Sequence, residues 1–469
     1  MSLRFAAAAL GILSGLWAGC SAKYPTLLGE PQADRSVCLV HGRVLAGESL
    51  APAEDADLCF ADGRIVSLAA HAQAKLPPDA RIIDVKGATV LPGLIDTHVH
   101  VIATEAPPWR MRRPDENHNL AAWLHAGVTT VFDMGGPPGQ LHKLQGELEN
   151  RTRVGPHLAH AHEPFTAPGG HPIPAIKALL PWPAGWLLAR QVKTLATAEA
   201  AAALVKSAKG SGAQYIKIIH DALPPGAPQL DPTRLRALVE AAHAEGLKVF
   251  VHIGSNRDAL EAVAAGADHL AHGVYREEVS DELVRQLREH RVSVTYTAAG
   301  FDNTRRMALG EYAPDSWAEA TSDPELVAAV SGAAGSQFAR TPVVGEFARG
   351  IASGELLRRN IGKLHAGGVT VLVGTDSPVA AVFPGGSFHE ELAILHEAGI
   401  PAPTLLHRAT VDAARLLSAT PDFGALAIGM RADVLVVAGD PLRELSALRG
   451  IQHLFLSGRE IPRLVSPSP

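Results

Sequence analysis

Hydrophobic residues in the middle of the chain fall into short continuous runs, separated by longer stretches with helical periodicity. The runs predict eight buried strands, at 89–99, 128–133, 157–162, 215–220, 248–253, 269–273, 292–298 and 369–375. Helices are predicted between most of them, for example at 231–245, 258–265 and 281–290. Strands that alternate with helices are typical of a parallel sheet. Eight such strands over roughly 330 residues predict an α/β fold of the (β/α)8 or TIM-barrel type.

Both ends of the chain carry a different pattern, in which short apolar runs are broken by turn residues. Such runs occur throughout 35–91 and return at 433–438 and 453–459. We expect the two ends to pair into one small β-sandwich beside the barrel. A long stretch at 300–350 exceeds a single connecting helix and predicts an extra helical lid over the barrel mouth. The expected organisation is a leader at 1–20, the β-sandwich at 35–91 and 423–464, and the barrel domain at 92–422.

The leader fits neither pattern. A basic residue precedes an apolar run at 5–17, which is too short to span a bilayer comfortably and is typical of a signal-peptide core. The run leads into Ala-Gly-Cys20, which resembles a bacterial lipobox, although Trp17 stands where leucine is usual. We therefore expect an exported protein, either periplasmic or anchored to the membrane through a lipid on Cys20. Plain secretion, with cleavage near Ala18 or Ala22, is the alternative.

Composition narrows the class of protein further. Apolar residues make up 47% and charged residues 19%, which is ordinary for a globular protein. The formal net charge is −6 and no run of Lys and Arg occurs, so no nucleic-acid surface is predicted. Cys38 and Cys59 lie in separate strand-like runs, where they form a disulfide in an oxidising compartment or remain as buried thiols.

Polar residues interrupt two of the predicted barrel strands, and a barrel carries its chemistry at the carboxyl ends of its strands. The first strand ends in His98-Val99-His100. Because side chains alternate along a strand, both imidazoles point to the same side and can chelate one metal ion. In the fourth strand Lys217 lies within an apolar run. A buried ammonium is costly, so this lysine must be paired, neutralised or modified.

Three further strands end in side chains of the same kind. His252 ends the fifth strand, His272 ends the sixth and Asp376 follows the eighth. Taken singly, each of these residues could be a buried core histidine or a helix cap. Such roles do not explain why all of them occur, in order, at the ends of barrel strands. Together with the segments 93–100, 127–136, 167–171 and 429–437, they resemble the amidohydrolase superfamily. The resemblance covers nearly the whole chain after the leader, and it is closest to the branch of imidazolonepropionase-like proteins and metal-dependent prolidases.

The resemblance implies a binuclear metal centre. It assigns one divalent ion, most simply zinc, to His98, His100 and Asp376, and a second ion to His252 and His272. It further implies that Lys217 is carboxylated to a carbamate that bridges the two ions, which would resolve the cost of burying that lysine. A hydroxide between the ions would attack the substrate carbonyl. Asp376 would accept the proton of the water and pass it to the leaving nitrogen.

The residues that face the substrate are less defined. A Gly-Gly pair usually follows the strand-four lysine in prolidase-like members, whereas here His220 lies in a different loop sequence and either contacts substrate or caps the loop. His171, after two glycines, either binds the substrate or orders its loop. Tyr296 either hydrogen-bonds in the pocket or packs. The lid residues Arg305 and Arg306 are further candidates for a substrate carboxylate, and His389 is expected to be structural.

These features predict a hydrolase of a small-molecule amide. The first hypothesis is a dipeptidase, prolidase-like enzyme or N-acyl amino acid hydrolase. Hydrolysis of a cyclic amide, a lactone or an aryl amide on the same site is the alternative, because a fold does not determine the substrate. A third hypothesis, from another class, is a ligand-binding lipoprotein with an idle metal site. Asp376 argues against it, since a binder needs no proton acceptor there. The sequence leaves the oligomeric state open, a homo-oligomer included.

Overall fold

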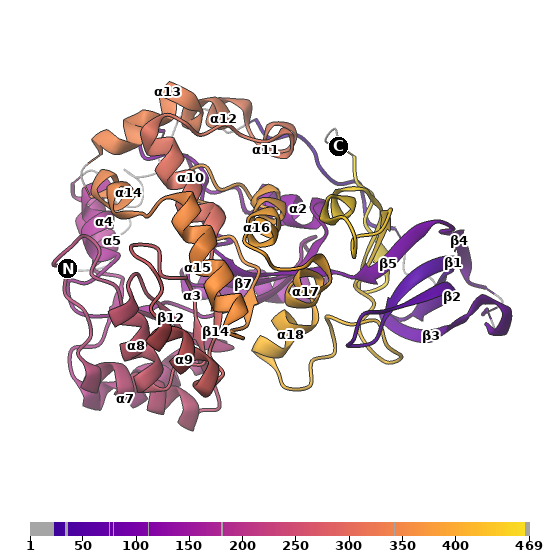
Figure 1. Ribbon diagram of the computed structural model, residues 1–469, viewed down its shortest axis with the longest axis horizontal. Helices are drawn as coiled ribbons and strands as arrows, with labels where there is room; N and C mark the ends of the chain where they lie inside the picture. The colour runs from indigo at the N-terminus through magenta and orange to yellow at the C-terminus, as the bar shows by residue number, and fades with distance from the viewer. Residues whose placement is uncertain are drawn as a thin grey trace, which may run out of the picture.

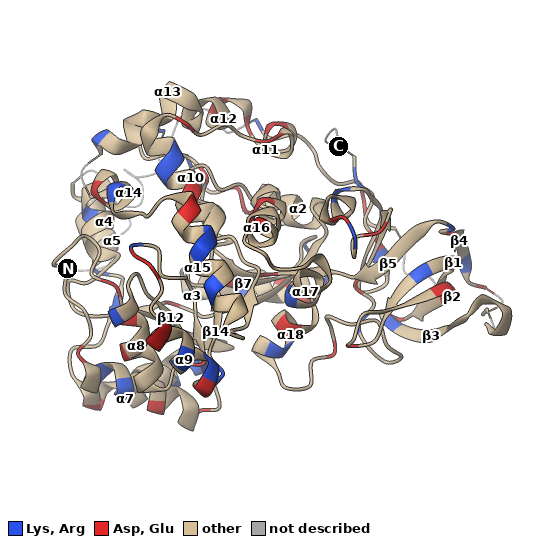
Figure 2. Cartoon of the chain, viewed as in Figure 1, with Lys and Arg blue, Asp and Glu red and all other residues tan. Residues whose placement is uncertain are grey.

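The computed structural model describes residues 23–32, 36–74, 76–77, 79–110, 112–179, 182–341 and 343–464. The predicted leader and Cys20 lie outside these residues. No helix in the described part of the chain combines the length and the apolarity that crossing a membrane requires. Positive and negative side chains are interspersed over the outer helices, as Figure 2 shows.

Two parallel sheets form the body of the molecule, which is therefore of the α/β class. The smaller sheet has the order β6 (Leu94–Val99), β7 (Val128–Asp133), β8 (His157–His160). The larger has the order β10 (Lys193–Thr194), β9 (Phe165–Thr166), β11 (Tyr215–Ile219), β12 (Lys248–His252), β13 (His269–Leu270), β14 (Ser293–Thr295), β15 (Val371–Leu372). All residues of β7 and β11 are buried, which explains why these strands are unbroken apolar runs in the sequence.

Helices connect these strands and surround the sheets (Figure 1). They are α2 (Glu116–His125), α3 (Pro138–Glu149), α4 (Ile173–Leu179), α5 (Ala184–Ala189), α6 (Ala201–Gly210), α7 (Pro232–Ala244), α8 (Asn256–Ala265), α9 (Asp281–His290), α15 (Gly354–Ala366), α16 (Gly386–Glu397), α17 (Ala402–Arg408) and α18 (Val411–Leu417). The stretch predicted as a lid holds α10 (Ala298–Leu309), α11 (Ser316–Thr321), α12 (Pro324–Val330), α13 (Gly332–Gly335) and α14 (Val344–Gly350). At the start of α7, the Asp231 carboxylate accepts the Arg234 amide at 2.9 Å and caps the helix.

The first predicted strand, 89–99, is two strands in the structure. Gly93 separates β5 (Ala88–Pro92), which belongs to another sheet, from β6. A Cβ on Gly93 would lie 2.0 Å from Oγ1 of Thr129, so only glycine allows the chain to pass β7 this closely. The predicted strand 292–298 is also shorter than expected, because α10 begins at Ala298.

Hydrogen bonds join the two parallel sheets at two places. At the first, the amide of Thr97 in β6 donates to the carbonyl of Val373 after β15, at 3.1 Å. At the second, the amide of Gln214, just before β11, donates to the carbonyl of His160 in β8, at 3.0 Å. Side chains from six parallel strands and α18 pack into one buried cluster, which includes Ile95, Phe132, Ala159, Tyr215, Phe250, Ala271, Leu372, Ala413 and Leu416.

The helix α18 identifies the amino ends of these strands. The carbonyl of Ala409, just before α18, accepts the amide of Ile95 at the start of β6, at 2.8 Å. The carboxyl end of β6, which carries the histidine pair, therefore points away from α18. In parallel sheets the neighbouring strands end on that same side.

The two ends of the chain meet in a third sheet, which projects from one side of the body in Figure 1. Its order is β18 (Arg459–Glu460), β17 (Ile451–Leu456), β16 (Val434–Ala438), β5, β1 (Val37–Ala46), β2 (Ala51–Ala61), β3 (Arg64–Ala70), with β4 (Arg81–Asp84) also paired to β1. Antiparallel pairing of β16 with β5 joins the C-terminal strands to the N-terminal ones. The two-layered sandwich predicted from the sequence is not confirmed, since the strand pairing traces one eight-stranded sheet.

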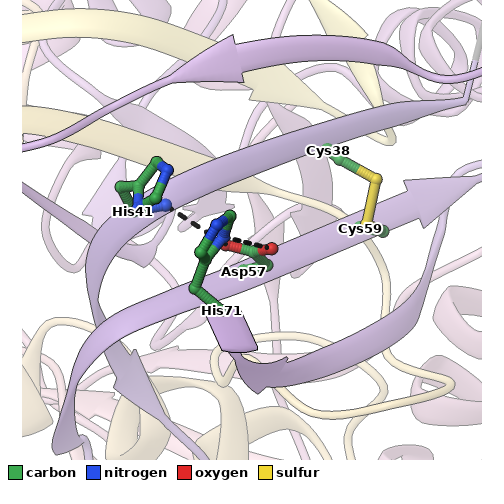
Figure 3. Close-up of a disulfide and its surroundings, with 5 residues drawn as sticks. All are labelled: Cys38, His41, Asp57, Cys59 and His71. Atoms are coloured by element: carbon green, nitrogen blue, oxygen red, sulfur yellow. Dashed lines mark hydrogen bonds and ion pairs between the residues drawn. A yellow bond between two sulfur atoms is a disulfide. The ribbon is translucent and has the colours of Figure 1, made fainter. Parts of the chain in front are cut away.

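A disulfide links the first two strands of this sheet. Cys38 in β1 and Cys59 in β2 face each other in the strand register, and their sulfur atoms are bonded (Figure 3). The pairing resolves the choice between a disulfide and two thiols that the sequence left open. On the same sheet, the buried Asp57 carboxylate contacts Nδ1 of His71 at 2.9 Å and the amide of His41 at 3.2 Å. These contacts hold the turn at His71 against β2.

Removal of this disulfide should lower the stability of the terminal sheet. The double substitution Cys38→Ala and Cys59→Ala is expected to cost about 2–4 kcal/mol, because it opens a covalent loop in the unfolded chain. Thermal unfolding followed by circular dichroism would measure this as a lower midpoint. Unsubstituted protein unfolded with a reductant should show the same decrease, and an unchanged midpoint in both would contradict the prediction.

Candidate metal centre

The histidine pair of β6 and the aspartate after β15 meet at one point. His98 lies inside β6, and His100 lies one residue beyond it. Asp376 Oδ1 is 3.2 Å from Nε2 of each histidine. The ligand atoms of the three side chains lie within 4.8 Å of one another. Among the residues that the structure describes, they form a group that can hold a metal ion.

Asp376 is held here by an unusual backbone conformation. Its φ is 65°, in the left-handed region that costs a non-glycine residue about 1–3 kcal/mol. The amide of Asp376 donates to the carbonyl of His98 at 2.7 Å, and the amide of Thr375 donates to the same carbonyl at 3.2 Å. These bonds hold the chain after β15 against β6, and the carboxylate is thereby presented to both histidines.

Two more histidines lie beside this group. His252 ends β12, and His272 lies two residues beyond β13. The ring centroid of His272 is 4.5 Å from that of His98 and 4.3 Å from that of His252. His171, from the loop after β9, places its ring 5.4 Å from His252. The structure thus gathers all the predicted histidine ligands, together with His171, at the carboxyl ends of the strands.

Lys217 lies in the middle of β11, where it is buried with the rest of the strand. Burial lowers the pKa of its ammonium to about 7, although the Asp376 carboxylate acts in the opposite direction. Its Nζ has no hydrogen-bond partner in the described part of the chain. An unpaired amine is costly to bury, so the position favours a further group that would engage Nζ.

The electrostatics of the centre disfavour protons on two of its histidines, whereas the Asp376 carboxylate outweighs burial and raises the pKa of His100. Burial, followed by the Lys217 charge, lowers the pKa of His98 to about 3. Burial likewise lowers the pKa of His272. Neutral imidazole is the form that binds metals. Both ring nitrogens of His98 are buried and lack a hydrogen bond to any described residue, although Nε2 is 3.2 Å from Asp376. Unpaired imidazoles beside a carboxylate are a donor set that suits zinc.

Neighbouring groups orient two of the rings. The carbonyl of Gly135 can only accept, so Nδ1 of His100, at 3.2 Å, carries a proton; in the neutral ring Nε2, beside Asp376, is the nitrogen left for a metal ion. The hydroxyl of Thr297 donates to the carbonyl of Tyr296 at 2.7 Å and therefore accepts from Nδ1 of His272 at 2.8 Å. Nε2 of His272 is thus also left without a proton. Such outer partners are usual around metal ligands.

Two candidate substrate-facing residues have partners elsewhere, which favours the structural alternatives that the sequence left open for them. Nε2 of His220 lies 2.8 Å from Glu261 on α8, and its ring is almost completely buried. His220 therefore caps the loop against α8. The hydroxyl of Tyr296 donates to the carbonyl of Val274, and its side chain is fully buried. Tyr296 packs in the core because β14 ends before it and α10 follows directly.

The remaining candidates are His389 and the two lid arginines. Nε2 of His389 donates to the carbonyl of Ala126 at 3.0 Å, which confirms the structural role expected for it. The guanidinium of Arg306 lies 5.8 Å from the ring centroid of Tyr312. In the described part of the chain, neither it nor Arg305 has a recorded contact with the clustered histidines.

Three residues near the centre were missed from the sequence. Thr297 supports His272, and the Glu391 carboxylate accepts the amides of Ala298 and Ala299 at the start of α10, at 3.1 and 2.7 Å. Asp221 lies 3.2 Å from Nε2 of His252. The only local signal was for Asp221, which lies in the loop that departs from the Gly-Gly pattern.

Zinc binding should stabilise the protein through this centre. At a free Zn²⁺ concentration about 100 times the dissociation constant, binding adds about 2.7 kcal/mol to the free energy of unfolding. Most of this gain is expected to be lost in His100→Asn, which removes one ligand atom. The matched control is His269→Asn, a buried histidine of β13 that pairs with Ser293 and Thr295 instead. Thermal midpoints with and without Zn²⁺ provide the measurement, and equal zinc-induced shifts in wild type and His100→Asn would contradict the assignment.

Comparison with known proteins gives relatives for this fold and centre. An enamidase of Eubacterium barkeri is 38% identical over 102 residues, which cover 21% of this chain and 25% of the enamidase. An imidazolonepropionase of Sphingopyxis alaskensis is 25% identical over 263 residues, which cover 52% of this chain and 64% of that protein. This chain thus spans less than two thirds of either relative.

Solved structures match over more of the chain. A prolidase complexed with N-methylphosphonate-L-proline is similar with a TM-score of 0.70 at 23% identity, covering 92% of this chain and 100% of the other. A Xaa-Pro dipeptidase with bound methionine has a TM-score of 0.72 at 20% identity, covering 91% and 100%. At this identity the likeness shows a shared fold. The model of the amidohydrolase family matches residues 89–461. The chain therefore belongs to the amidohydrolase family.

Proposed function

We propose that this protein is a hydrolase that cleaves the amide bond of a dipeptide or an N-acyl amino acid at a centre of two metal ions. The observation that carries the proposal is the group formed by His98, His100 and Asp376, whose ligand atoms lie within 4.8 Å of one another. His252 and His272 extend it with two further imidazoles, whose ring centroids are 4.3 Å apart and could hold a second ion.

We also propose that the two parallel sheets form one (β/α)8 barrel. Its strands would be β6, β7, β8, β11, β12, β13, β14 and β15. The hydrogen bonds of Thr97 to Val373 and of Gln214 to His160 join the sheets at two places, and side chains from six of these strands meet in one buried cluster, as in a filled barrel interior. Fold likeness to the prolidase and the dipeptidase supports this interpretation.

The buried lysine is best explained as a bridging ligand. Lys217 has a lowered pKa of about 7, so a large fraction of it is the free amine near neutral pH. A free amine can add carbon dioxide and lose a proton, which yields a carbamate anion. Such an anion would engage both ions and remove the cost of the unpaired Nζ. His98, His100 and Asp376 would hold the first ion, and His252 and His272 the second, with zinc favoured by the imidazole-rich set.

The chemistry would then depend on Asp376. Two divalent ions, when bound, supply a Lewis acid for the substrate carbonyl and lower the pKa of water from 15.7 to about 7. Asp376 is kept anionic because His98 and His100 outweigh the effect of burial and hold its pKa well below the usual range. It can therefore accept a proton from the attacking water and return it to the leaving nitrogen. His171, whose ring lies 5.4 Å from His252, is placed to bind the substrate carbonyl or carboxylate.

The second part of the proposal is the substrate class, which the comparisons support. The solved structures include a prolidase and a Xaa-Pro dipeptidase, which favours dipeptides. The partial sequence likeness runs instead to an enamidase and an imidazolonepropionase, so a cyclic amide, lactone or aryl amide is the second candidate. The sequence motif at Cys20 alone supports the further proposal of export with a lipid anchor.

A substrate screen of the metal-loaded chain separates these candidates. Dipeptides, N-acyl amino acids, cyclic amides and lactones would be compared by the release of amine or acid. Cleavage of dipeptides or N-acyl amino acids with a free carboxylate supports the first candidate. Turnover of cyclic amides or lactones alone overturns it, and inertness toward all classes favours a binding role with an idle metal site.

Substitution of Asp376 should separate metal binding from turnover. In Asp376→Asn the amide oxygen still faces the ion but cannot accept a proton. We expect kcat to fall by about 10²–10⁴, while much of the bound metal is retained. Steady-state kinetics and elemental analysis of the same samples provide the two readouts. Activity close to that of wild type would remove this role from Asp376.

A further inference from the structure

A buried network lies just behind His252. Asp221, two residues beyond β11, has a side chain with 0% exposure. Its Oδ2 accepts the Tyr275 hydroxyl at 2.6 Å and lies 3.2 Å from Nε2 of His252. Its Oδ1 is 2.6 Å from Nη2 of Arg276. Loops that follow β11, β12 and β13 thus converge on one carboxylate.

The partners of Asp221 keep it ionised. Arg276 balances its charge directly, and Nη2 of this guanidinium also donates to the Tyr275 hydroxyl at 3.0 Å. A buried carboxylate of this kind can only accept hydrogen bonds.

The loop after β12 packs closely against this network. Gly254 lies two residues beyond His252, and a Cβ there would be 2.8 and 2.9 Å from the two oxygens of Asp221. It would also be 3.0 Å from Cζ of Arg276. Only a residue without a side chain allows the backbone after β12 to pass this close to the ion pair. The backbone after β12 therefore packs directly against the Asp221 carboxylate and the Arg276 guanidinium.

These contacts determine which nitrogen of His252 is free. Since Asp221 can only accept, the 3.2 Å contact requires a proton on Nε2 of His252. The neutral ring then has its lone pair on Nδ1, on the side away from Asp221. His272 lies on the site side, with a ring-centroid distance of 4.3 Å. The arrangement mirrors that of His272, whose Nδ1 is engaged by Thr297 and whose Nε2 is free.

We infer that Asp221 is a positioning residue, which fixes His252 as the Nε2–H tautomer and directs its Nδ1 toward the second ion. The inference rests on the proposed two-metal function. It also gives a role to the loop after β11. This loop contains His220 and Asp221, whereas in prolidase-like relatives a Gly-Gly pair usually follows the strand-four lysine. Through His252, this carboxylate sets the affinity for the ion held by His252 and His272, while the ion at His98, His100 and Asp376 does not depend on it.

The test compares metal binding by two variants of the full chain. In Asp221→Asn the anionic acceptor is lost and the shape is kept. In the control Asp258→Asn, a carboxylate of similar burial is removed from the start of α8, where it caps the helix through Ser255 and does not touch His252. Metal-stripped protein would be titrated with Co²⁺, with calorimetry and the visible absorption of bound cobalt as readouts. Circular dichroism would establish that both variants are folded.

We expect the weaker Co²⁺ site of Asp221→Asn to lose about 10–100-fold in affinity, with the other site unchanged, because outer partners of metal ligands contribute on this scale. Asp258→Asn should bind both ions as the wild type does. Unchanged affinities in Asp221→Asn, or equal losses at both sites or in both variants, would overturn the inference.

A second measurement does not involve metal. In the metal-free chain labelled with ¹⁵N-histidine, the His252 signals, assigned with His252→Asn, should report the Nε2–H tautomer in the wild type. Asp221→Asn should shift them toward a mixture with the Nδ1–H form. If the wild type binds only one Co²⁺, the two-metal function fails, and the tautomer alone then decides the role of Asp221. An Nδ1–H form in the wild type would refute it.

Discussion

The site depends on one buried carboxylate that joins two strands distant in sequence. Asp96 in β6 accepts the amide of Thr375 at 3.1 Å and its hydroxyl at 2.8 Å, and also the amide of His98 at 3.2 Å. Burial raises the pKa of Asp96 to about 7, although the hydrogen bonds from Thr375 and His98 oppose the shift. These bonds hold the chain after β15 in the register that places Asp376 against His98. Without these hydrogen bonds, the Asp376 carboxylate would not be held beside the histidine pair.

Neighbouring groups hold the side chains of the metal centre in fixed orientations. Gly135 and Thr297 determine the free nitrogens of His100 and His272, and Glu391 holds the start of α10 directly behind Thr297. Burial raises the pKa of Glu391 to about 8, with the amides of α10 acting against that shift. A site held by fixed donors and acceptors requires little reorganisation when a charged ligand enters. At the centre, both ring nitrogens of His98 and Nζ of Lys217 have no hydrogen-bond partner among the described residues, and a cation and an anion would satisfy them.

Much of this arrangement could be predicted because its signals are local. Alternation along a strand places His98 and His100 on one side whatever the rest of the chain does. Lys217 is conspicuous because a charge interrupts a run that is apolar on both faces. Residues whose roles depend on distant partners were not predictable in this way. His220 faces Glu261 on α8, and the hydroxyl of Tyr296 donates to the carbonyl of Val274, and the sequence could not choose these structural roles over contact with substrate.

By itself, the sequence determined the alternation of strands and helices, the strand ends that carry His98, His252 and Asp376, and membership of a metal-using family. These follow from periodicity and from residue types that are costly to bury without a partner. Tertiary structure decided which of them meet, that Cys38 and Cys59 are bonded, and that Asp221 lies behind His252. Such contacts join segments tens to hundreds of residues apart. Their geometry depends on strand register and loop closure, which no local pattern specifies.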